Sequence, residues 1–241
     1  MKIIPNIPAA LFLAGDVLWA DRFAKGIDYM RDHNATKEEM ALIKEALGGW
    51  SKRILDKWDW TINAKGLENL PESGPVVFIS NHQGFADVLP FMHCVPFQCG
   101  FIAKSEIKKV PHFATWVTRT RGLFINRGDA RASLRTISQG AEYLKQGFSM
   151  VIFPEGTRSR EEGHPLGDFH PGSFKLATKA KVPIMPVTIS GSYKCFEETG
   201  VMQKHQSFDV TFHEMIDVAS MDRHQQAELP EMVKSIIQSA L

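Results

Sequence analysis

In VVFISNHQGFAD, residues 76–87, an apolar run leads directly into a polar turn and then into a helical pattern. A short apolar run that is bounded by turn residues is typical of a buried strand. The residues after the turn, 85–93, carry apolar side chains at helical spacing. A strand, a turn and a helix in this order indicate an α/β protein.

The same alternation of apolar runs and helical segments extends outward from this stretch and occupies the chain from residue 59 onward. The segment 154–172 differs, because it is rich in Gly, Pro and charged residues and has no clear element. Long irregular loops in compact domains are commonly functional. We predict strands at 61–64, 76–80, 99–103, 123–125, 150–153, 184–189 and 208–212, and helices at 85–93, 112–118, 129–146, 173–180 and 225–240.

Two prolines, Pro183 and Pro186, lie in the apolar run 182–187. Proline has no N–H group to donate to a β-ladder. We therefore expect this run to be an edge strand or the beginning of a strand, with an apolar wall beside the site.

Residues 1–58 form a different unit, for which we predict a hairpin of two helices at 8–32 and 36–58. Apolar residues recur every three or four positions in both segments, and Thr36 with Glu39 matches a capping box at the start of the second. Nine basic and nine acidic residues balance over 1–60, so the hairpin lacks a polybasic face. Its aromatic stripe either packs on the main domain or contacts a membrane, and its members are Phe12, Trp19, Phe23, Trp50 and Trp58.

The composition limits the class of protein. The 241 residues include 28 Lys and Arg against 27 Asp and Glu, a balance that argues against a nucleic-acid binder. The three cysteines, Cys94, Cys99 and Cys195, argue against a disulfide framework and a zinc site and favour a reducing compartment. No apolar run reaches the roughly 18–20 residues that span a bilayer. We expect a protein that is soluble or lies on a membrane surface.

His82 and Asp87 are candidates for acid–base chemistry. His82 follows the apolar run 76–80, and Asp87 lies in the helical segment after Gly84. On one continuous helix the two residues would point about 140° apart, so His82 must precede the helix for their side chains to meet. A carboxylate paired with an imidazole fixes its tautomer, as a general base acting on a hydroxyl requires. Taken alone, the spacing also fits a histidine at a helix start or in a core.

A local excess of basic residues favours an anionic ligand. The short strand segment GLFINR, residues 122–127, contains Gly122 and Phe124 and ends on Arg127. Arginine makes bidentate contacts with phosphate, and lysine supplies a point charge. Arg131 and Arg135 also fit the solvated face of a helix. Between 101 and 135 the basic residues are Lys104, Lys108, Lys109, Arg119, Arg121, Arg127, Arg131 and Arg135, and the acids are Glu106 and Asp129.

A second candidate for anion binding is FPEGTRSR, residues 153–160, which follows directly after an apolar run. Gly156 permits a close approach of the backbone to a ligand. The neighbouring N–H groups, the Thr157 hydroxyl and Arg158 could therefore surround an anion.

Taken in order, four segments resemble the four motif blocks of the lysophosphatidate acyltransferase (PlsC-like) glycerolipid acyltransferases. Residues 103–107 also resemble the lysine-containing segment of that family, and the resemblance covers roughly residues 59–215. The four segments are Asn81-His82-x4-Asp87, Gly122-x-Phe124-Ile125-x-Arg127, Phe153-Pro154-Glu155-Gly156-Thr157-Arg158-Ser159 and the run 182–187.

The resemblance implies an α/β acyltransferase domain at 59–241, with a mixed central sheet flanked by helices, after the hairpin at 1–58. It implies transfer of a fatty acyl chain from acyl-CoA or acyl-ACP to a lysophospholipid hydroxyl, without a cofactor or a metal ion. The first expected acceptor is 1-acyl-glycerol-3-phosphate, which gives phosphatidate; lyso-ornithine lipid or another lysophospholipid is the alternative. Some bacterial members have a two-helix element that enters one leaflet, so we expect a peripheral protein on the cytoplasmic face of a membrane.

The expected mechanism needs no acyl-enzyme. His82, oriented by Asp87, takes the proton of the acceptor hydroxyl while its oxygen attacks the thioester carbonyl. Glu155 either orients nearby cations or contacts the glycerol backbone. The residues expected to bind substrate are Lys104, Gly122, Phe124, Arg127, Glu155, Gly156, Thr157 and Arg158.

Two other classes of protein remain open at this point. An acyl thioesterase would use the same pair, His82 and Asp87, on water. A non-catalytic lipid-binding protein would keep the fold but would not need the pair.

Overall fold

The computed structural model describes residues 4–126, 128–159 and 164–241. Each predicted strand is present, with both ends within one residue of its predicted bounds. The strands are β1 (Thr61–Lys65), β2 (Val77–Ser80), β3 (Cys99–Lys104), β4 (Leu123–Ile125), β5 (Ser149–Ile152), β6 (Ile184–Ser190) and β7 (Ser207–Phe212). The helices are α1 (Ile7–Asp32), α2 (Thr36–Trp58), α3 (Leu89–His93), α4 (Pro111–Arg119), α5 (Ala130–Lys145), α6 (Lys175–Ala180) and α7 (Arg223–Gln238).

The strands form one mixed sheet in the order β1-β7-β6-β2-β5-β3-β4. The five strands from β6 to β4 are parallel, whereas β7 pairs with β6 in antiparallel fashion and with β1 in parallel. The predicted mixed α/β class is therefore confirmed. Parallel strands bring their carboxyl ends to the same edge of a sheet, which is where such folds bind ligands.

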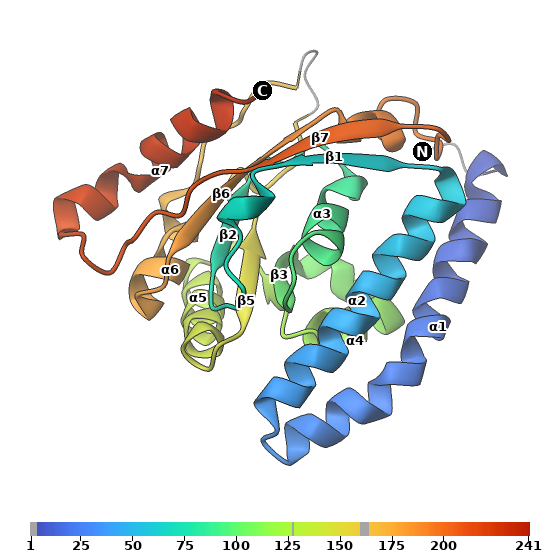
Figure 1. The fold of residues 1–241 in the computed structure, drawn as a ribbon, viewed down its shortest axis with the longest axis horizontal. Coiled ribbons are helices and arrows are strands. Elements are labelled where there is room, and N and C mark those ends of the chain that lie inside the picture. The colour runs from blue at the N-terminus through green and yellow to red at the C-terminus, as the bar shows by residue number, and fades with distance from the viewer. Residues whose placement is uncertain (1–3, 127, 160–163) are drawn as a thin grey trace.

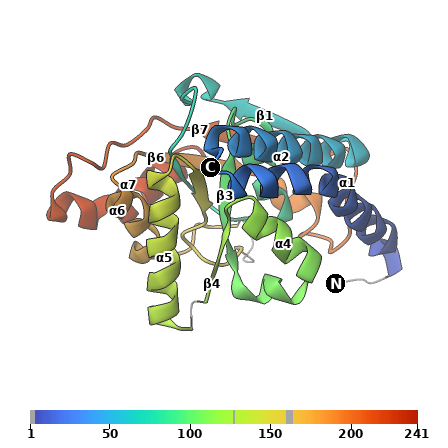
Figure 2. The ribbon, with the colours of Figure 1, turned by 90° about the horizontal axis from the view of Figure 1, so that it is seen from below.

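Helices cover both faces of the sheet (Figures 1 and 2). The hairpin α1–α2 lies on one side with α3 and α4, and α5, α6 and α7 lie on the other. The alternation of side chains along β2 separates the two cores: Phe78 joins the cluster under the hairpin, while Val77 and Ile79 join the cluster under α5 to α7. The hairpin and the sheet thus share one continuous hydrophobic cluster.

The expectation of an edge strand for the run 182–187 is wrong for Pro186, because β6 lies between β2 and β7. Pro183 does precede the strand, as the alternative expected. The regular pairing of β6 with β7 ends at Val187, opposite Phe212. Beyond it the Pro186 carbonyl accepts the His213 N–H at 3.0 Å, and an isolated bridge joins Ile184 to Ile216. Pro186 thus lies where the ladder is irregular and takes part in it through its carbonyl, so its missing N–H is tolerated inside the sheet.

The capping box predicted at the start of α2 is also wrong. The residue before the helix is Ala35, and no side chain caps the helix. The Glu39 carboxylate instead pairs with Arg31 and Arg121, which lie outside α2.

The predicted helix 85–93 is divided into a 3-10 turn, η3 (Phe85–Val88), and the short helix α3.

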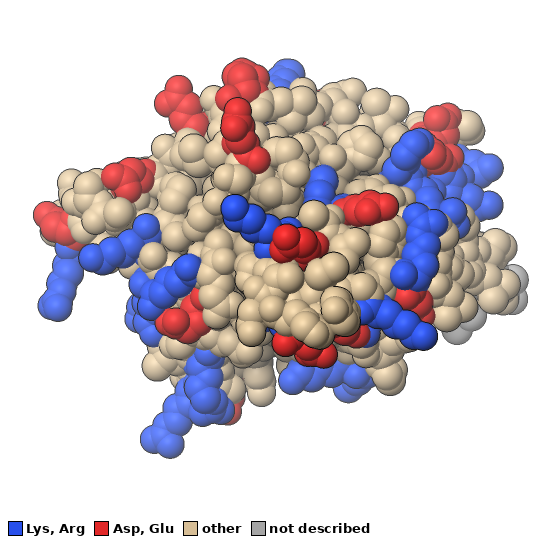
Figure 3. All heavy atoms as spheres, turned by 60° about the horizontal axis from the view of Figure 1, so that its bottom comes forward, with Lys and Arg blue, Asp and Glu red and all other residues tan. Residues whose placement is uncertain are grey.

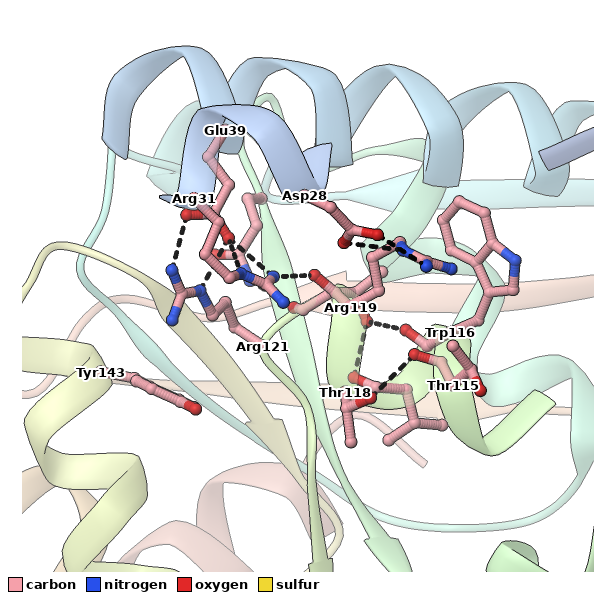
Figure 4. Close-up of polar contacts among 12 residues, drawn as sticks. Asp28, Arg31, Glu39, Thr115, Trp116, Thr118, Arg119, Arg121 and Tyr143 are labelled. Atoms are coloured by element: carbon pink, nitrogen blue, oxygen red, sulfur yellow. Dashed lines mark hydrogen bonds and ion pairs between the residues drawn. The ribbon is translucent and has the colours of Figure 1, made fainter. Parts of the chain in front are cut away.

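Glu39 of α2 lies almost fully buried between two arginines (Figure 4). Its Oε1 accepts hydrogen bonds from Arg31 Nη2 and Arg121 Nε, both at 2.7 Å, and its Oε2 accepts one from Arg121 Nη2 at 2.6 Å. Arg31 lies on α1, and Arg121 lies between α4 and β4. One carboxylate therefore joins both hairpin helices to the edge of the sheet.

A second set of polar contacts joins α1 to α4. Asp28 pairs with Arg119 through both carboxylate oxygens, at 3.1 Å and 2.8 Å (Figure 4). About two turns earlier on the same face of α1, Asp21 accepts a hydrogen bond from Trp116 Nε1 at 2.9 Å and lies 3.0 Å from His112 Nε2. Arg119 and Arg121, two of the eight basic residues between 101 and 135, thus hold the hairpin against the rest of the protein.

The surface of the hairpin side carries mixed charges. Figure 3 shows basic and acidic side chains interspersed over this face, in agreement with the balance counted over 1–60. Across the described residues, none of the helices combines the length and the apolarity needed to cross a membrane.

Candidate active site

The carboxyl end of β2 leads into the turn that holds His82 and Asp87. His82 Nδ1 lies 2.7 Å from Asp87 Oδ2, and the same oxygen accepts the backbone N–H groups of Gln83 at 2.6 Å and Gly84 at 2.8 Å. Asp87 is fully buried in η3. The predicted meeting of the two side chains across the turn is therefore confirmed. Because the carboxylate only accepts hydrogen bonds, the ring proton lies on Nδ1 and Nε2 is left as the basic nitrogen.

The connection after β6 supports this turn from the side. The Ser192 hydroxyl donates to Asp87 Oδ1, and the Gly191 N–H donates to Gln83 Oε1 at 2.9 Å. Asn81 ties the two strands together, because its side chain exchanges two hydrogen bonds with the backbone of Ile189, at 2.7 and 2.8 Å. Neighbouring parallel strands thus hold both sides of the Asp87 carboxylate.

The carboxyl end of β5 forms the other wall. Phe153 stacks on the imidazole of His82, with ring centroids 4.2 Å apart and an interplanar angle of 17°. The backbone of Ser159 also donates to the His82 carbonyl at 3.0 Å. The imidazole is therefore fixed by a carboxylate at one nitrogen and by an aromatic face.

Glu155 anchors the loop 154–172 to the turn. Its Oε1 accepts the His82 N–H at 2.8 Å, and its Oε2 accepts the Gly167 N–H at 2.9 Å. Burial raises the pKa of Glu155, although these two backbone bonds act in the opposite direction. Both oxygens are directed to the backbone, and neither bonds to a cation among the described residues.

Arg158 lies beside the turn and pairs with a residue outside the motif segments. Its Nη1 is 2.5 Å from Glu197 Oε1, and the same oxygen accepts the Phe85 N–H at 2.9 Å. Burial raises the pKa of Glu197, against the effects of Phe85 and Arg158. The second carboxylate oxygen, Oε2, is buried and has no hydrogen-bond partner among the described residues.

An apolar cavity of about 580 Å³ opens beside His82. Its volume lies within the range of about 300–1,000 Å³ that is usual for small-molecule sites. The charged and histidine side chains in its lining are His82, Lys104, Glu106 and Arg158, and the apolar lining comes mainly from α1, α2, α3, α4 and β3. The apolar lining includes Val17, Ala20, Ala46, Leu47, Trp50, Val88, Met92, Phe101, Phe113, Trp116 and Val117.

The structure brings some of the predicted substrate-binding residues to this cavity and not others. Lys104, Gly156 and Arg158 line it with His82, whereas Thr157 is exposed outside the lining. Gly122 fills a packing position, since a Cβ there would lie 2.7 Å from the Val117 carbonyl oxygen.

Two further predicted residues lie elsewhere or are not described. Phe124 is half-buried, with Lys108 Nζ 5.2 Å from its ring centroid, and does not line the cavity. Arg127 lies outside the described residues.

The aromatic stripe of the hairpin faces inward. Phe23, Trp50 and Trp58 are buried, and Phe12 packs edge-on against Trp58 with centroids 5.0 Å apart. Trp19 lies against Gly49, where a Cβ would overlap its ring. These five side chains therefore pack against the hairpin–sheet cluster, as one alternative expected, with Phe12 and Trp19 only partly buried. Membrane contact by them stays a prediction.

Sequence reasoning missed Ser192 and Glu197. Both lie in the connection after β6, outside any local pattern that spaces them with His82. The only available signal was the position of this connection, after the last motif strand, at the edge where the carboxyl ends of the parallel strands meet.

Cys195, in the same connection, is not suited to attack a thioester. It is fully buried, and burial raises the pKa of its thiol to about 12, with Glu197 and Asp87 adding to the shift. A thiolate is the reactive form, so this side chain stays inert at neutral pH.

Comparison with known proteins gives one consistent result. Curated relatives include a chloroplastic 1-acyl-sn-glycerol-3-phosphate acyltransferase of Arabidopsis thaliana, 34% identical over 68% of this chain and 46% of that protein. The 1-acyl-sn-glycerol-3-phosphate acyltransferase of Borreliella burgdorferi is 30% identical over 71% of this chain and 68% of that protein. The human alpha form is 36% identical over 56% of this chain and 47% of that protein. The chain thus spans about half the length of several curated relatives that it matches.

In fold, the chain is similar to the crystal structure of the 1-acyl-sn-glycerophosphate acyltransferase PlsC from Thermotoga maritima. The TM-score is 0.78 at 23% sequence identity, over 100% of this chain and 96% of that one. The family model described as Acyltransferase matches residues 61–190, which is more than half of the chain. This range contains His82, Asp87 and all four motif segments, and on this match the chain belongs to the acyltransferase family.

Proposed function

We propose that the protein acylates 1-acyl-glycerol-3-phosphate to phosphatidate, with an acyl-CoA or an acyl-ACP as the donor. His82 Nε2 takes the proton of the free hydroxyl while the hydroxyl oxygen forms a bond to the thioester carbonyl carbon. The C–S bond then breaks, and the leaving thiolate takes the proton from His82. Atoms and charges balance without a covalent intermediate on the protein.

The observation that carries this proposal is that His82, which is paired with the buried Asp87, lines an apolar cavity. Asp87 Oδ2 is 2.7 Å from Nδ1, so the carboxylate fixes the tautomer in which Nε2 can act as a base. The cavity has the apolar lining that an acyl chain needs. A base that is fixed in the lining of an apolar cavity of this size suits acyl transfer to an alcohol better than it suits a scaffold.

Direct attack by the acceptor hydroxyl is favoured over an acyl-enzyme, because the nearby serine and cysteine side chains are not suited to attack the thioester. The Ser192 hydroxyl is engaged with Asp87, and the Cys195 thiol is buried with a pKa raised to about 12. A thioester is already activated, so positioning and one base account for much of the rate.

The acceptor's phosphate would bind to Lys104 and Arg158, the two basic side chains that line the cavity. Arginine offers a planar fork to phosphate, and lysine adds a point charge. The sequence adds Arg127 to this set. The buried Glu155 would act indirectly, because it holds the backbone of His82 and Gly167 rather than a ligand.

The protein would work as a peripheral protein on the cytoplasmic face of a membrane. The exposed apolar side chains of α1 include Ile7, Leu11 and Leu18, which are four and seven residues apart and therefore share one face of the helix. A lipid that enters from a membrane would reach an apolar cavity without crossing water.

The test is thiol release from a long-chain acyl-CoA in mixed micelles, with wild type beside His82→Ala. We expect release that requires lysophosphatidate and that falls by about 10²–10⁴-fold in the variant, the usual contribution of a general base. Release only with lyso-ornithine lipid or another lysophospholipid would change the acceptor. Release without any acceptor would replace the proposal with a thioesterase, and silence with both acyl-CoA and acyl-ACP would favour a lipid-binding protein.

A further inference from the structure

The connection after β6 brings a carboxylate into the His82 turn from outside the motif segments. Glu197 accepts the Phe85 N–H at 2.9 Å and Arg158 Nη1 at 2.5 Å, both on Oε1. These contacts lie 112 and 39 residues away along the chain. One carboxylate oxygen therefore joins the turn after β2, which holds Phe85, to the loop after β5, which holds Arg158.

The turn is shaped to admit this carboxylate. Gly84 has no side chain, and a Cβ at that position would overlap Glu197 Oε2 and lie 3.0 Å from Cδ. The Glu197 side chain is 15% exposed, whereas that of Arg158 is 39% exposed. An acidic group that is mostly removed from water is stable there only with a charged or hydrogen-bonded partner.

We infer that Glu197 is a positioning residue that holds the Arg158 guanidinium beside the His82 turn, in the lining of the cavity, for the acceptor's phosphate. The inference rests on the proposed function, because Arg158 matters to the reaction only as a ligand of that phosphate. Glu197 itself touches neither reacting group and acts through Arg158.

The physical reason is the flexibility of arginine. A half-exposed arginine has many rotamers, and ordering it on ligand binding costs affinity. The ion pair with Glu197 uses Nη1 and orders the guanidinium before a ligand arrives. A guanidinium has five N–H donors, so the remaining donors are available for phosphate oxygens.

A carboxylate beside a phosphate site could also act in the opposite way, by repelling the phosphate. The two effects predict changes of opposite sign. If repulsion dominates, neutralising Glu197 strengthens acceptor binding; if positioning dominates, neutralising it weakens acceptor binding. The close contact with Arg158 and the shared bond to Phe85 favour positioning.

The test compares Glu197→Gln with Glu198→Gln, an exposed neighbour of the same type. Glutamine keeps an oxygen that can accept the Phe85 N–H, so the turn is retained, but it removes the charge opposite Arg158. We expect the acceptor KM to rise about tenfold, as for the loss of one charge-assisted hydrogen bond, with donor KM and kcat nearly unchanged. Glu198→Gln should behave as wild type.

A double-mutant cycle with Arg158→Ala identifies the route of the effect. If Glu197 acts through Arg158, Glu197→Gln adds less than about twofold to the acceptor KM once Arg158 is absent. Full additivity, a lowered acceptor KM, or an equal loss of activity toward both substrates would each overturn the inference. The two proposals are separable: no lysophosphatidate acylation by wild type removes both, whereas a raised KM in Arg158→Ala with no effect of Glu197→Gln removes only this one.

Discussion

Glu39 Oε2 lies 2.6 Å from Arg121 Nη2, although the two residues are 82 positions apart and belong to the hairpin and to the α4–β4 connection. With Arg31 on the other oxygen, Glu39 is a buried acid held by two bases. Removing one member of such a group leaves uncompensated charge in the interior. The position of the hairpin over the cavity therefore depends on a contact that no motif contains.

Glu39→Gln should lower the free energy of unfolding by about 3 kcal/mol, the size typical of breaking a buried ion pair. Urea denaturation measures this change directly. Glu38→Gln, at the exposed neighbouring position, should change it by less than about 0.5 kcal/mol. Equal losses in the two variants would show that the buried cluster does not contribute.

Ser192→Ala should lower kcat about fivefold with little change in either KM, because one hydrogen bond of about 1 kcal/mol to Asp87 is lost. Asp87→Asn should have a larger effect, since an amide cannot accept from all of its partners and no longer fixes the imidazole tautomer. Steady-state kinetics with acyl-CoA and lysophosphatidate checks both. Ser220→Ala, at an exposed serine, is the control; a KM effect without a kcat effect would contradict the role of Ser192.

The strands and the His82–Asp87 pair were predictable because their signals are local. An apolar run, a glycine turn and a helical segment place both side chains within six residues of each other. The opposite case is Glu39, whose spacing from Thr36 matched a capping box while its carboxylate bonds to Arg121, far along the chain. A local pattern cannot compete with a buried partner that only the tertiary structure supplies.

The positions of Ser192, Glu197 and Pro186 in the fold could not be predicted, because they depend on which strands are neighbours. The pairing of β6 with β2 brings the connection after β6 to the His82 turn and also places Pro186 inside the sheet. Strand order is not encoded in periodicity. In the same way, the aromatic stripe of the hairpin was visible in the sequence, but its direction toward the sheet was not.

Ala46→Phe should shift donor preference toward shorter acyl chains. Ala46 lies on the wall of the cavity that α2 provides, so a phenyl ring there removes space from an acyl chain. Excluding two methylene groups costs about 1.6 kcal/mol, so kcat/KM for the longest chains should fall about tenfold relative to short ones. The measurement is kcat/KM over a series of acyl-CoA lengths. Ala41→Phe, on the exposed side of α2, should leave the profile unchanged.

The stability of the protein should fall as the pH drops below about 6.5, in part through His213. Burial lowers the pKa of His213 below its ordinary value of 6.5, and its Nε2 lies 2.8 Å from Thr188 Oγ1. Below pH 6.5 the unfolded chain therefore binds a proton that the folded chain does not, so unfolding becomes more favourable as the pH falls.

Thermal unfolding between pH 8 and pH 5 measures this effect. His213→Gln should show a smaller fall in Tm over this range than wild type, whereas His224→Gln, at an exposed site, should follow wild type. A wild-type slope retained in His213→Gln would assign the pH dependence to other groups. His93 is one such group, since burial also lowers its pKa.

Leu11→Ser with Leu18→Ser should weaken liposome binding by tenfold or more, because two leucines, 69% and 65% exposed, lie on the outer face of α1. Each leucine contributes about 1.5–3 kcal/mol when it leaves water. Flotation with vesicles measures the bound fraction, and Leu134→Ser on α5 is the matched control. Trp19→Ser should instead lower Tm, since its ring packs on Gly49. Unchanged flotation of the double leucine variant would contradict membrane contact through this face of α1.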